Sequence, residues 1–209
     1  MWPDSPRQAL AWTRATPWKA WAELRRLAAW PWVRLYFARH GVPVGEGWRI
    51  YGRPRLQRHR HSRMVFGDRL ELRNWWHANP LGIDHPCLLT TWAPNALLQL
   101  GNSVGISGGI LCAGQLVQLG DRVTVGANCT IMDTDFHPLE PGERAASPLS
   151  GATSPVVIED DVFIGTQSLI LKGSQIGRGA VIGAGSVVRG DVPAGAIAAG
   201  NPAQIIGHL

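Results

Sequence analysis

A six-residue repeat constrains the fold of this chain more than any other feature of its 209 residues. Branched aliphatic residues recur at every sixth position through six consecutive units, at Ile158, Ile164, Ile170, Ile176, Ile182 and Val188. The six-residue spacing continues at Ala194, Gly200 and Ile206, although Ala194 and Gly200 are not branched. Gly often follows the branched residue, and the fifth position of each unit is small or branched. An amphipathic helix would instead need apolar residues at three- and four-residue steps.

Six residues provide one short strand and one turn, so three units close a triangular coil of about 18 residues. The branched residue points inward, and the Gly or small residue turns the corner. Stacked coils bury a continuous aliphatic core and pair their backbones in parallel ladders. The repeat therefore predicts an all-β fold, a parallel β-helix built from hexapeptides.

The same spacing extends upstream, at Leu100, Ile106 and Cys112 and, after a one-residue slip, at Leu119, Val125 and Ile131. Cys112 would then occupy an inward position, as a small buried apolar residue rather than a reactive thiol. We expect the coil stack to begin between residues 45 and 65. The period breaks between Ile131 and Ile158, and the proline-containing segment 133–155 predicts a loop extruded from the coils. Long loops on rigid repeats are commonly functional.

Charge divides the chain into two regions. Residues 1–73 hold 15 Lys and Arg against 5 Asp and Glu, whereas residues 74–209 hold 5 against 10. Residues 17–40 predict a helix with a break at Pro31, and one stripe of this helix contains Trp18, Trp21, Leu24 and Leu27. Two interpretations stay open for it: a cap on the open end of the β-helix, or a basic, Trp-rich helix at a membrane surface. We expect an N-terminal Trp- and Arg-rich segment at 1–45 and a β-helix domain at 46–209.

Several classes of protein are excluded by composition. Three cysteines do not make a disulfide scaffold and suggest a reducing compartment. No apolar run reaches the roughly 18 residues of a membrane span, and no secretory signal pattern is present, so we expect a cytoplasmic protein. If the predicted helix at residues 17–40 binds a membrane surface, the protein would also contact the inner membrane peripherally. No nucleic-acid-binding motif accompanies the arginine-rich segment 53–63, so its basic face suits acidic lipids or phosphorylated substrates better than nucleic acid.

His137 is the candidate catalytic residue. It stands in the stretch Asp-Thr-Asp-Phe-His-Pro at residues 133–138, where the repeat ends and the loop begins. An imidazole can act as a general base near neutral pH. Asp133 and Asp135 are close in sequence, and one of them could orient the imidazole or stabilise its charge.

The period-six run, residues 133–138 and the Gly-Asn-Pro-Ala stretch at 200–203 together resemble the hexapeptide-repeat acyltransferases. The sugar O-acetyltransferases of the maltose, galactoside and exopolysaccharide-cluster type are the most similar kind. Residues 79–82 (Asn-Pro-Leu-Gly), with His85 and Pro86, also resemble the exopolysaccharide-cluster members. The resemblance covers residues 45–207 and implies a left-handed β-helix, a homotrimer, and acetyl-CoA as co-substrate in the groove between subunits. It implies no permanently bound cofactor and no metal.

The resemblance also implies roles for individual residues. His137 would deprotonate an acceptor hydroxyl for direct transfer, with no covalent acyl-enzyme, and Ser107 would face the acetyl group or the acceptor. The residues matched to coenzyme A contacts are Phe163, Gly165, Thr166, Ala184 and Gly185. Basic residues common in the family are replaced here by Gly190 and Gly207, so Arg189 is the candidate for the coenzyme A phosphates.

The acceptor is expected to be a saccharide, lipid-linked or nucleotide-linked, in polysaccharide or glycan biosynthesis. Trp75 and Trp76 could stack on a sugar ring or pack within the cap. Two alternatives stay open: N-acyl transfer to a nucleotide-linked amino sugar, and a non-catalytic β-helix acting as an assembly platform. A β-helical carbonic anhydrase is excluded, because the coil region does not offer the three zinc-binding histidines that it needs.

Overall fold

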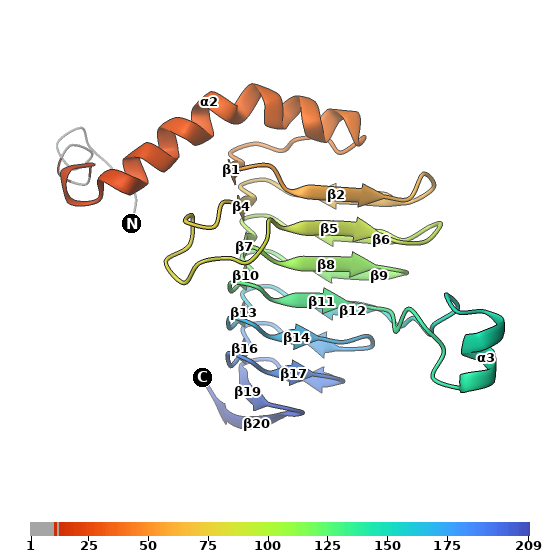
Figure 1. The fold of residues 1–209 in the computed structure, drawn as a ribbon. Helices are drawn as coiled ribbons and strands as arrows, with labels where there is room; N and C mark the ends of the chain where they lie inside the picture. The colour runs from red at the N-terminus through yellow and green to blue at the C-terminus, as the bar shows by residue number, and fades with distance from the viewer. Residues whose placement is uncertain (1–10, 12) are drawn as a thin grey trace.

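The computed structural model describes residues 11 and 13–209, and it shows a stack of coils with parallel strands on three sides. The coils follow one another from the N-terminal end at the top of Figure 1 to the C-terminal end at the bottom. The predicted left-handed parallel β-helix with an N-terminal helical segment is confirmed. The stack begins at Arg49, inside the predicted range of 45–65.

Three sheets of eight, six and six strands form the sides of the prism. The first sheet contains β1 (Arg49–Tyr51), β4 (Glu71–Arg73), β7 (Gly105–Ser107), β10 (Thr124–Val125), β13 (Phe163–Ile164), β16 (Val181–Ile182), β19 (Ala196–Gly200) and β20 (Ala203–His208). The second contains β2 (Arg55–Arg58), β5 (Leu88–Thr91), β8 (Ile110–Ala113), β11 (Thr130–Met132), β14 (Leu169–Ile170) and β17 (Val187–Val188). The third contains β3 (Arg63–Phe66), β6 (Leu97–Leu100), β9 (Leu116–Leu119), β12 (Val156–Ile158), β15 (Gln175–Ile176) and β18 (Asp191–Val192).

Each sheet contributes a column of buried side chains to the core, as the repeat predicts. In-register pairing stacks Ile50, Leu72, Ile106, Val125, Ile164, Ile182 and Ala198 in the first sheet. The second column is Leu56, Leu89, Leu111, Ile131, Ile170 and Val188. The third is Phe66, Leu100, Leu119, Ile158, Ile176 and Val192. Neighbouring strand residues point outward, because successive side chains alternate across a strand.

Two details of the predicted register are wrong. Leu111, not Cys112, pairs with Ile131 and enters the inward column, because β8 is a four-residue strand and its inward residues are one position out of step with the hexad count.

Cys112 is nevertheless buried, and burial raises the pKa of its thiol to about 11, with the charge of Asp133 adding to the effect. The thiol therefore stays protonated at neutral pH.

The repeat also ends earlier than its spacing suggests. Ala194, Gly200 and Ile206 are exposed, whereas Ala196 and Ala198 are buried. The register is lost before Ala194, because the successive inward residues Val188 and Val192 are only four positions apart. The pairing then changes as well, since β19 and β20 form an antiparallel hairpin that closes the C-terminal coil.

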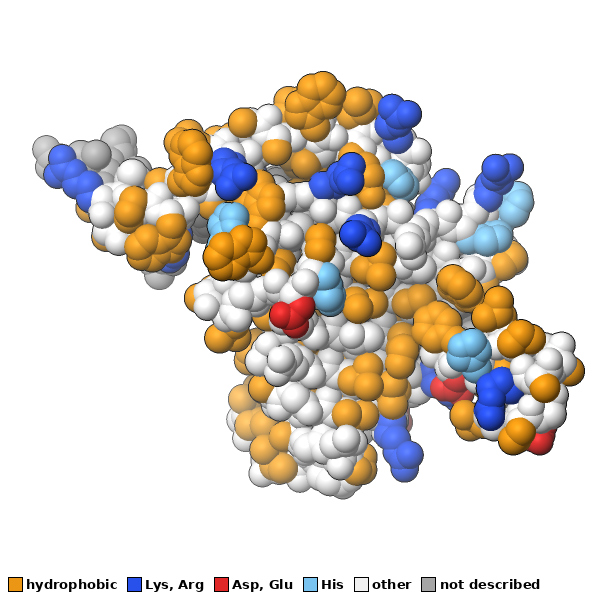
Figure 2. Space-filling model, in the orientation of Figure 1, with side chains coloured by type: hydrophobic (Ala, Val, Ile, Leu, Met, Phe, Trp, Pro, Cys, Tyr) orange, Lys and Arg blue, Asp and Glu red, His pale blue; other side chains and the backbone are white. Residues whose placement is uncertain are grey.

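Helix α2 (Pro17–Arg39) covers the N-terminal end of the stack. It runs through Pro31, so the predicted break is wrong: proline removes one backbone donor, and tertiary packing holds the second half of the helix. Val33 and Phe37 are its buried residues, and the Phe37 ring lies 5.1 Å from that of Trp48. The predicted Trp18–Leu27 stripe does not do this packing. On the face seen in Figure 2, most basic side chains lie over this N-terminal part of the molecule.

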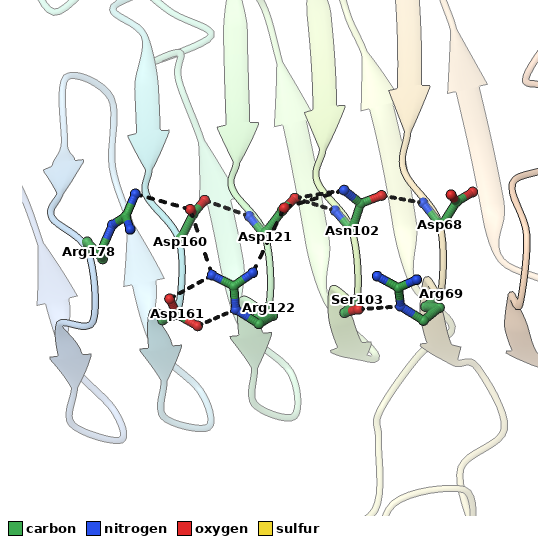
Figure 3. Close-up of polar contacts among 9 residues, drawn as sticks. All are labelled: Asp68, Arg69, Asn102, Ser103, Asp121, Arg122, Asp160, Asp161 and Arg178. Atoms are coloured by element: carbon green, nitrogen blue, oxygen red, sulfur yellow. Dashed lines mark hydrogen bonds and ion pairs between the residues drawn. The ribbon is translucent and has the colours of Figure 1, made fainter.

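A ladder of side-chain hydrogen bonds joins successive coils at the corner between the third and first sheets (Figure 3). Side-chain oxygens of Asp68, Asn102, Asp121 and Asp160 accept the backbone N–H groups of Glu46, Asp68, Asn102 and Asp121, at 2.7–2.9 Å. Hydrogen bonds from Asn102 lower the pKa of Asp121, and the guanidinium of Arg122 lowers that of Asp161. This ladder stabilises the turns on which the strands of the first sheet are aligned.

The segment 133–155 leaves the prism between β11 and β12 and contains the short helix α3 (Pro141–Ala146) (Figure 1). A second irregular segment, residues 74–86, joins β4 to β5. Among the helices of the described chain, none combines the length and apolar character of a membrane span.

Candidate active site

A groove of about 670 Å³ runs along the outer face of the first sheet. Five of the residues predicted from the sequence line it: Ser107, Phe163, Gly165, Thr166 and Ala184. They come from β7, from β13 with the turn that follows it, and from the turn after β16. Gly185 is the next residue after Ala184. The structure thus brings together residues that the sequence separates by more than seventy positions.

Glycines shape the wall of this groove. A Cβ atom on Gly165 would lie 2.5 Å from the backbone nitrogen of Ala184, and one on Gly126 would lie 2.6 Å from that of Thr166. Successive coils therefore meet backbone to backbone at this corner, which only glycine permits. Phe163 stands on the outward side of β13, 47% exposed, because its neighbour Ile164 points inward. The wall is apolar around Phe163 and rich in backbone groups beside it.

Ser107 is buried at the base of the groove, and its hydroxyl accepts a hydrogen bond from the side-chain amide of Asn79 at 3.1 Å. Asn79 belongs to the segment 74–86, and its own carbonyl oxygen accepts the N–H of Leu81 at 2.9 Å. Asn79 and Leu81 both line the groove. Sequence reasoning did not identify Asn79 as a site residue, although the Asn-Pro-Leu-Gly stretch was a signal for it.

The N-terminal end of the groove is charged. Arg69, Glu71 and Arg73 line it. Arg73 pairs with Glu71 at 2.6 Å, and Arg69 donates to the hydroxyl of Ser103 at 2.9 Å. These residues were not predicted as part of the site, because the sequence does not show that β4 lies beside β7, the strand that carries Ser107.

His137 is exposed at the root of the extruded segment, and its Nδ1 atom contacts the backbone carbonyl of Pro148. A carbonyl oxygen can only accept a hydrogen bond, so Nδ1 carries the proton. The Nε2 atom of the neutral imidazole then keeps a lone pair. This tautomer leaves Nε2 available to accept a proton from another molecule.

Neither predicted aspartate touches the imidazole. Asp133 is fully buried, and its carboxylate accepts the backbone N–H groups of Gly114, Gln115 and Leu116 at 2.6–2.7 Å. Asp135 forms an ion pair with Lys172 at 3.2 Å. The carbonyl of Pro148 therefore orients the His137 imidazole, a role that the sequence suggested for a carboxylate. Asp133 instead stabilises the turn at residues 114–116 of the preceding coil.

A short two-stranded ladder positions His137. Asp135 donates its N–H to the carbonyl of Ala152 at 3.0 Å, and Gly151 donates to that of Phe136 at 3.1 Å. Phe136 has a left-handed backbone (φ 61°), which is unfavourable for an aromatic residue, and its ring packs edge-on against Trp92 at 5.8 Å. The two sides of the ladder lie so close at Gly151 that a Cβ atom there would be 2.4 Å from the carbonyl carbon of Phe136.

We therefore expect Gly151→Ala to displace His137 without unfolding the β-helix. A shift of about 1 Å in a reacting group can lower a rate by about a hundredfold, so kcat should fall between roughly tenfold and a hundredfold. Gly142→Ala is the matched control, because a Cβ atom there meets only the end of the flexible Glu140 side chain, at 3.0 Å. Equal activities of the two variants would contradict the positioning role of Gly151.

Within one chain, the predicted residues fall into two sets. The groove lies on the first sheet, whereas His137 and Arg189 lie at the corner between the second and third sheets. Trp75 packs beneath α2, with the Arg25 guanidinium 5.0 Å from its ring centroid, whereas Trp76 is 74% exposed. In the part of the chain that the structure describes, no group of three or more His, Cys, Asp or Glu side chains could hold a metal ion.

The six-residue repeat matches a known family of proteins. The family described as bacterial transferase hexapeptide (six repeats) matches residues 155–190. The 2,3,4,5-tetrahydropyridine-2,6-dicarboxylate N-acetyltransferase of Staphylococcus aureus is 54% identical over 55 residues, which are 26% of this chain and 23% of the relative. The chain therefore spans about a quarter of the length of the curated relatives that it matches.

Solved structures extend the likeness over most of the fold. A mutant of AntD, an N-acyltransferase from Bacillus cereus, in complex with dTDP-4-amino-4,6-dideoxyglucose and coenzyme A, has a TM-score of 0.61 and 18% identity, covering 84% of this chain and 88% of that one. Galactoside acetyltransferase in complex with coenzyme A has a TM-score of 0.54 and 22% identity, covering 84% and 69%. The predicted resemblance is confirmed: the chain carries the hexapeptide repeat and has the fold of these acyltransferases.

Proposed function

We propose that this protein is an acetyl-CoA-dependent acetyltransferase that transfers an acetyl group to a hydroxyl of a saccharide. One observation carries the proposal: Phe163, Gly165, Thr166 and Ala184, which the family resemblance assigns to coenzyme A, line a single groove that also contains Ser107. The matched segment of an N-acetyltransferase and the fold shared with coenzyme A-bound acyltransferases support it.

The donor half of the site fits an extended pantetheine arm. Backbone groups at the Gly165 and Ala184 turns are suited to its amides, and the exposed Phe163 ring is suited to its apolar parts. The charged end, with Glu71 and Arg73, is left for the acceptor, beside Asn79 and Ser107. A saccharide presents many hydroxyls, and such paired charged and amide groups recognise them by hydrogen bonds.

The complete site requires a second copy of the chain. His137 projects from a different corner than the groove, so a base from one subunit must meet the donor bound to its neighbour. A homotrimer with its sites between subunits satisfies this requirement. The same arrangement would bring Arg189 of one subunit towards the donor groove of another, where it could hold coenzyme A phosphates.

The chemistry then follows from the tautomer of His137. Nε2 takes the proton of the acceptor hydroxyl while the oxygen attacks the thioester carbonyl carbon. The tetrahedral oxyanion is stabilised by nearby donors. The C–S bond then breaks, and the imidazolium returns its proton to the departing thiolate of coenzyme A. No covalent acyl-enzyme is formed, and positioning of the two substrates supplies much of the rate.

N-acyl transfer to a nucleotide-linked amino sugar is the second candidate. The fold shared with AntD, which is bound to such a sugar, favours it. A hydroxyl nucleophile depends more strongly on a general base than an amine does, and the available Nε2 of His137 favours the hydroxyl. Paired assays with a saccharide and its amino-sugar analogue separate the two reactions by the linkage formed.

Acetyl-CoA and free coenzyme A should each raise the melting temperature of the protein, because a ligand that binds only the folded state stabilises it. At about a hundredfold excess over Kd the gain is roughly 3 kcal/mol, or roughly 5–10 °C for a chain of this size. Phe163→Ala should reduce the shift, whereas Ile205→Ala, at a similarly exposed apolar position on β20, should not. No shift at millimolar acetyl-CoA would favour another acyl donor or the non-catalytic platform.

A further inference from the structure

Helix α2 presents a second apolar face, which is exposed to solvent and borders Arg53 and Trp75 of the β-helix at Trp32 and Leu35. Six of its large apolar side chains are between 48% and 73% exposed: Trp18, Trp21, Leu24, Leu27, Trp32 and Leu35. Residues 21, 24, 28, 32 and 35 follow the three- and four-residue steps of one helical stripe. Val33 and Phe37, which pack on the first coil, lie on the opposite side. None of the described residues covers this outer face, and contiguous apolar surface of this kind marks a site of interaction.

The charges around the outer face are positive. Helix α2 contains five basic residues and one acidic residue, Glu23. The Glu23 carboxylate is already engaged by Arg26 at 2.9 Å, by Arg49 at 2.7 Å and by the hydroxyl of Tyr51. Exposed arginines continue on the adjacent coil, at positions 53, 55, 58, 60 and 63. In Figure 2, none of the acidic side chains visible on that face lies over α2.

This combination fits an anionic lipid surface better than a second copy of the chain. Two copies of one basic face would repel each other, whereas lipid phosphates complement it. The tryptophan indole suits the boundary between headgroups and acyl chains, and arginine and lysine stems can lie along apolar surface while their charges reach the headgroups. Helix α2 lies across the end of the stack and extends beyond it (Figure 1), so a flat surface can contact the whole outer face.

We propose that α2 binds an anionic membrane, lying parallel to its surface with the outer face at the headgroup–acyl boundary. The buried face of the same helix keeps its packing on the first coil, through Val33 and Phe37. Capping of the β-helix and membrane binding thus use opposite sides of one helix. The inference rests on α2 and on the exposed arginines of the adjacent coil, and it does not depend on the proposed acetyl transfer.

The test is sedimentation of the full chain with vesicles of phosphatidylcholine, with and without phosphatidylglycerol. We expect retention on the anionic vesicles, little on the neutral ones, and weaker retention at high salt. Leu24→Glu should lower the partition coefficient by about tenfold or more, since it removes an inserted apolar side chain and adds a negative charge. Leu149→Glu is the matched control, because Leu24 and Leu149 are 59% and 64% exposed, but Leu149 lies in the extruded segment 133–155 and not on α2.

Circular dichroism and thermal melting of both variants show whether each one is folded. Loss of retention in folded Leu24→Glu, but not in Leu149→Glu, supports the proposal. Absence of retention for the unmodified chain overturns it, and so does equal retention by both variants. Sedimentation velocity without lipid identifies the alternative occupant: self-association that Leu24→Glu abolishes would assign the outer face to a second copy.

Discussion

Replacing His137 by Ala is expected to lower the rate of acetyl transfer by about 10²–10⁴-fold, the range typical for loss of a general base. The structure supplies the reason: the Pro148 carbonyl fixes the proton on Nδ1 and leaves Nε2 as the acceptor. The side chain is exposed and does not enter the coil core, so the variant should fold like the parent. Initial rates with acetyl-CoA and a saccharide acceptor, compared at saturation, measure the effect.

His85→Ala is the matched control for this experiment. His85 also contacts a backbone carbonyl through Nδ1, that of Pro86 at 3.0 Å, and it belongs to the segment that contributes Asn79 and Leu81 to the groove. The melting-temperature shift with coenzyme A should be unchanged in His137→Ala, since the donor contacts come from other coils. If His85→Ala abolished transfer and His137→Ala retained it, the base would lie in segment 74–86 of the same subunit.

The core was predictable from the sequence because the hexad spacing is enforced locally. An inward residue such as Ile164 or Ile182 must stack on its equivalents one coil away, and no other part of the chain alters that requirement. The prediction failed where the coil length changes, at Leu111, and where the pairing reverses, at β19 and β20. Spacing alone carries no information on either event.

The sequence allowed us to predict which residues belong to the candidate site, but not how they are arranged in space. The family resemblance pointed to the groove residues, and the place of His137 at the end of the repeat, together with that resemblance, pointed to His137. The sequence could not show that the Asp133 carboxylate accepts three backbone N–H groups. Those donors belong to a turn of the preceding coil, which comes next to Asp133 only when the coils stack. The sequence also could not show which face of α2 packs, since the helix is apolar on two sides.

Ile170→Asp is expected to prevent folding altogether. Ile170 is fully buried in the second column, between Ile131 and Val188 of the coils above and below. A carboxylate placed there has no partner. It must either stay charged or take up a proton and remain buried without hydrogen-bond partners, and either state costs several kcal/mol. The whole stability of a domain is only about 5–15 kcal/mol, and loss of one coil also removes the template for its neighbours. Soluble yield, circular dichroism and urea unfolding measure the effect.

Leu169→Asp makes the same chemical change one residue earlier and serves as the control. Leu169 pairs with Thr130 and Val187 on the outward side of β14 and is partly exposed, so its carboxylate reaches water. We expect a folded protein destabilised by about 1 kcal/mol, as for most partly exposed substitutions. A folded, soluble Ile170→Asp protein would contradict the register of the second column. The reverse pattern, with Leu169→Asp unfolded and Ile170→Asp stable, would place the two faces of the strand the other way round.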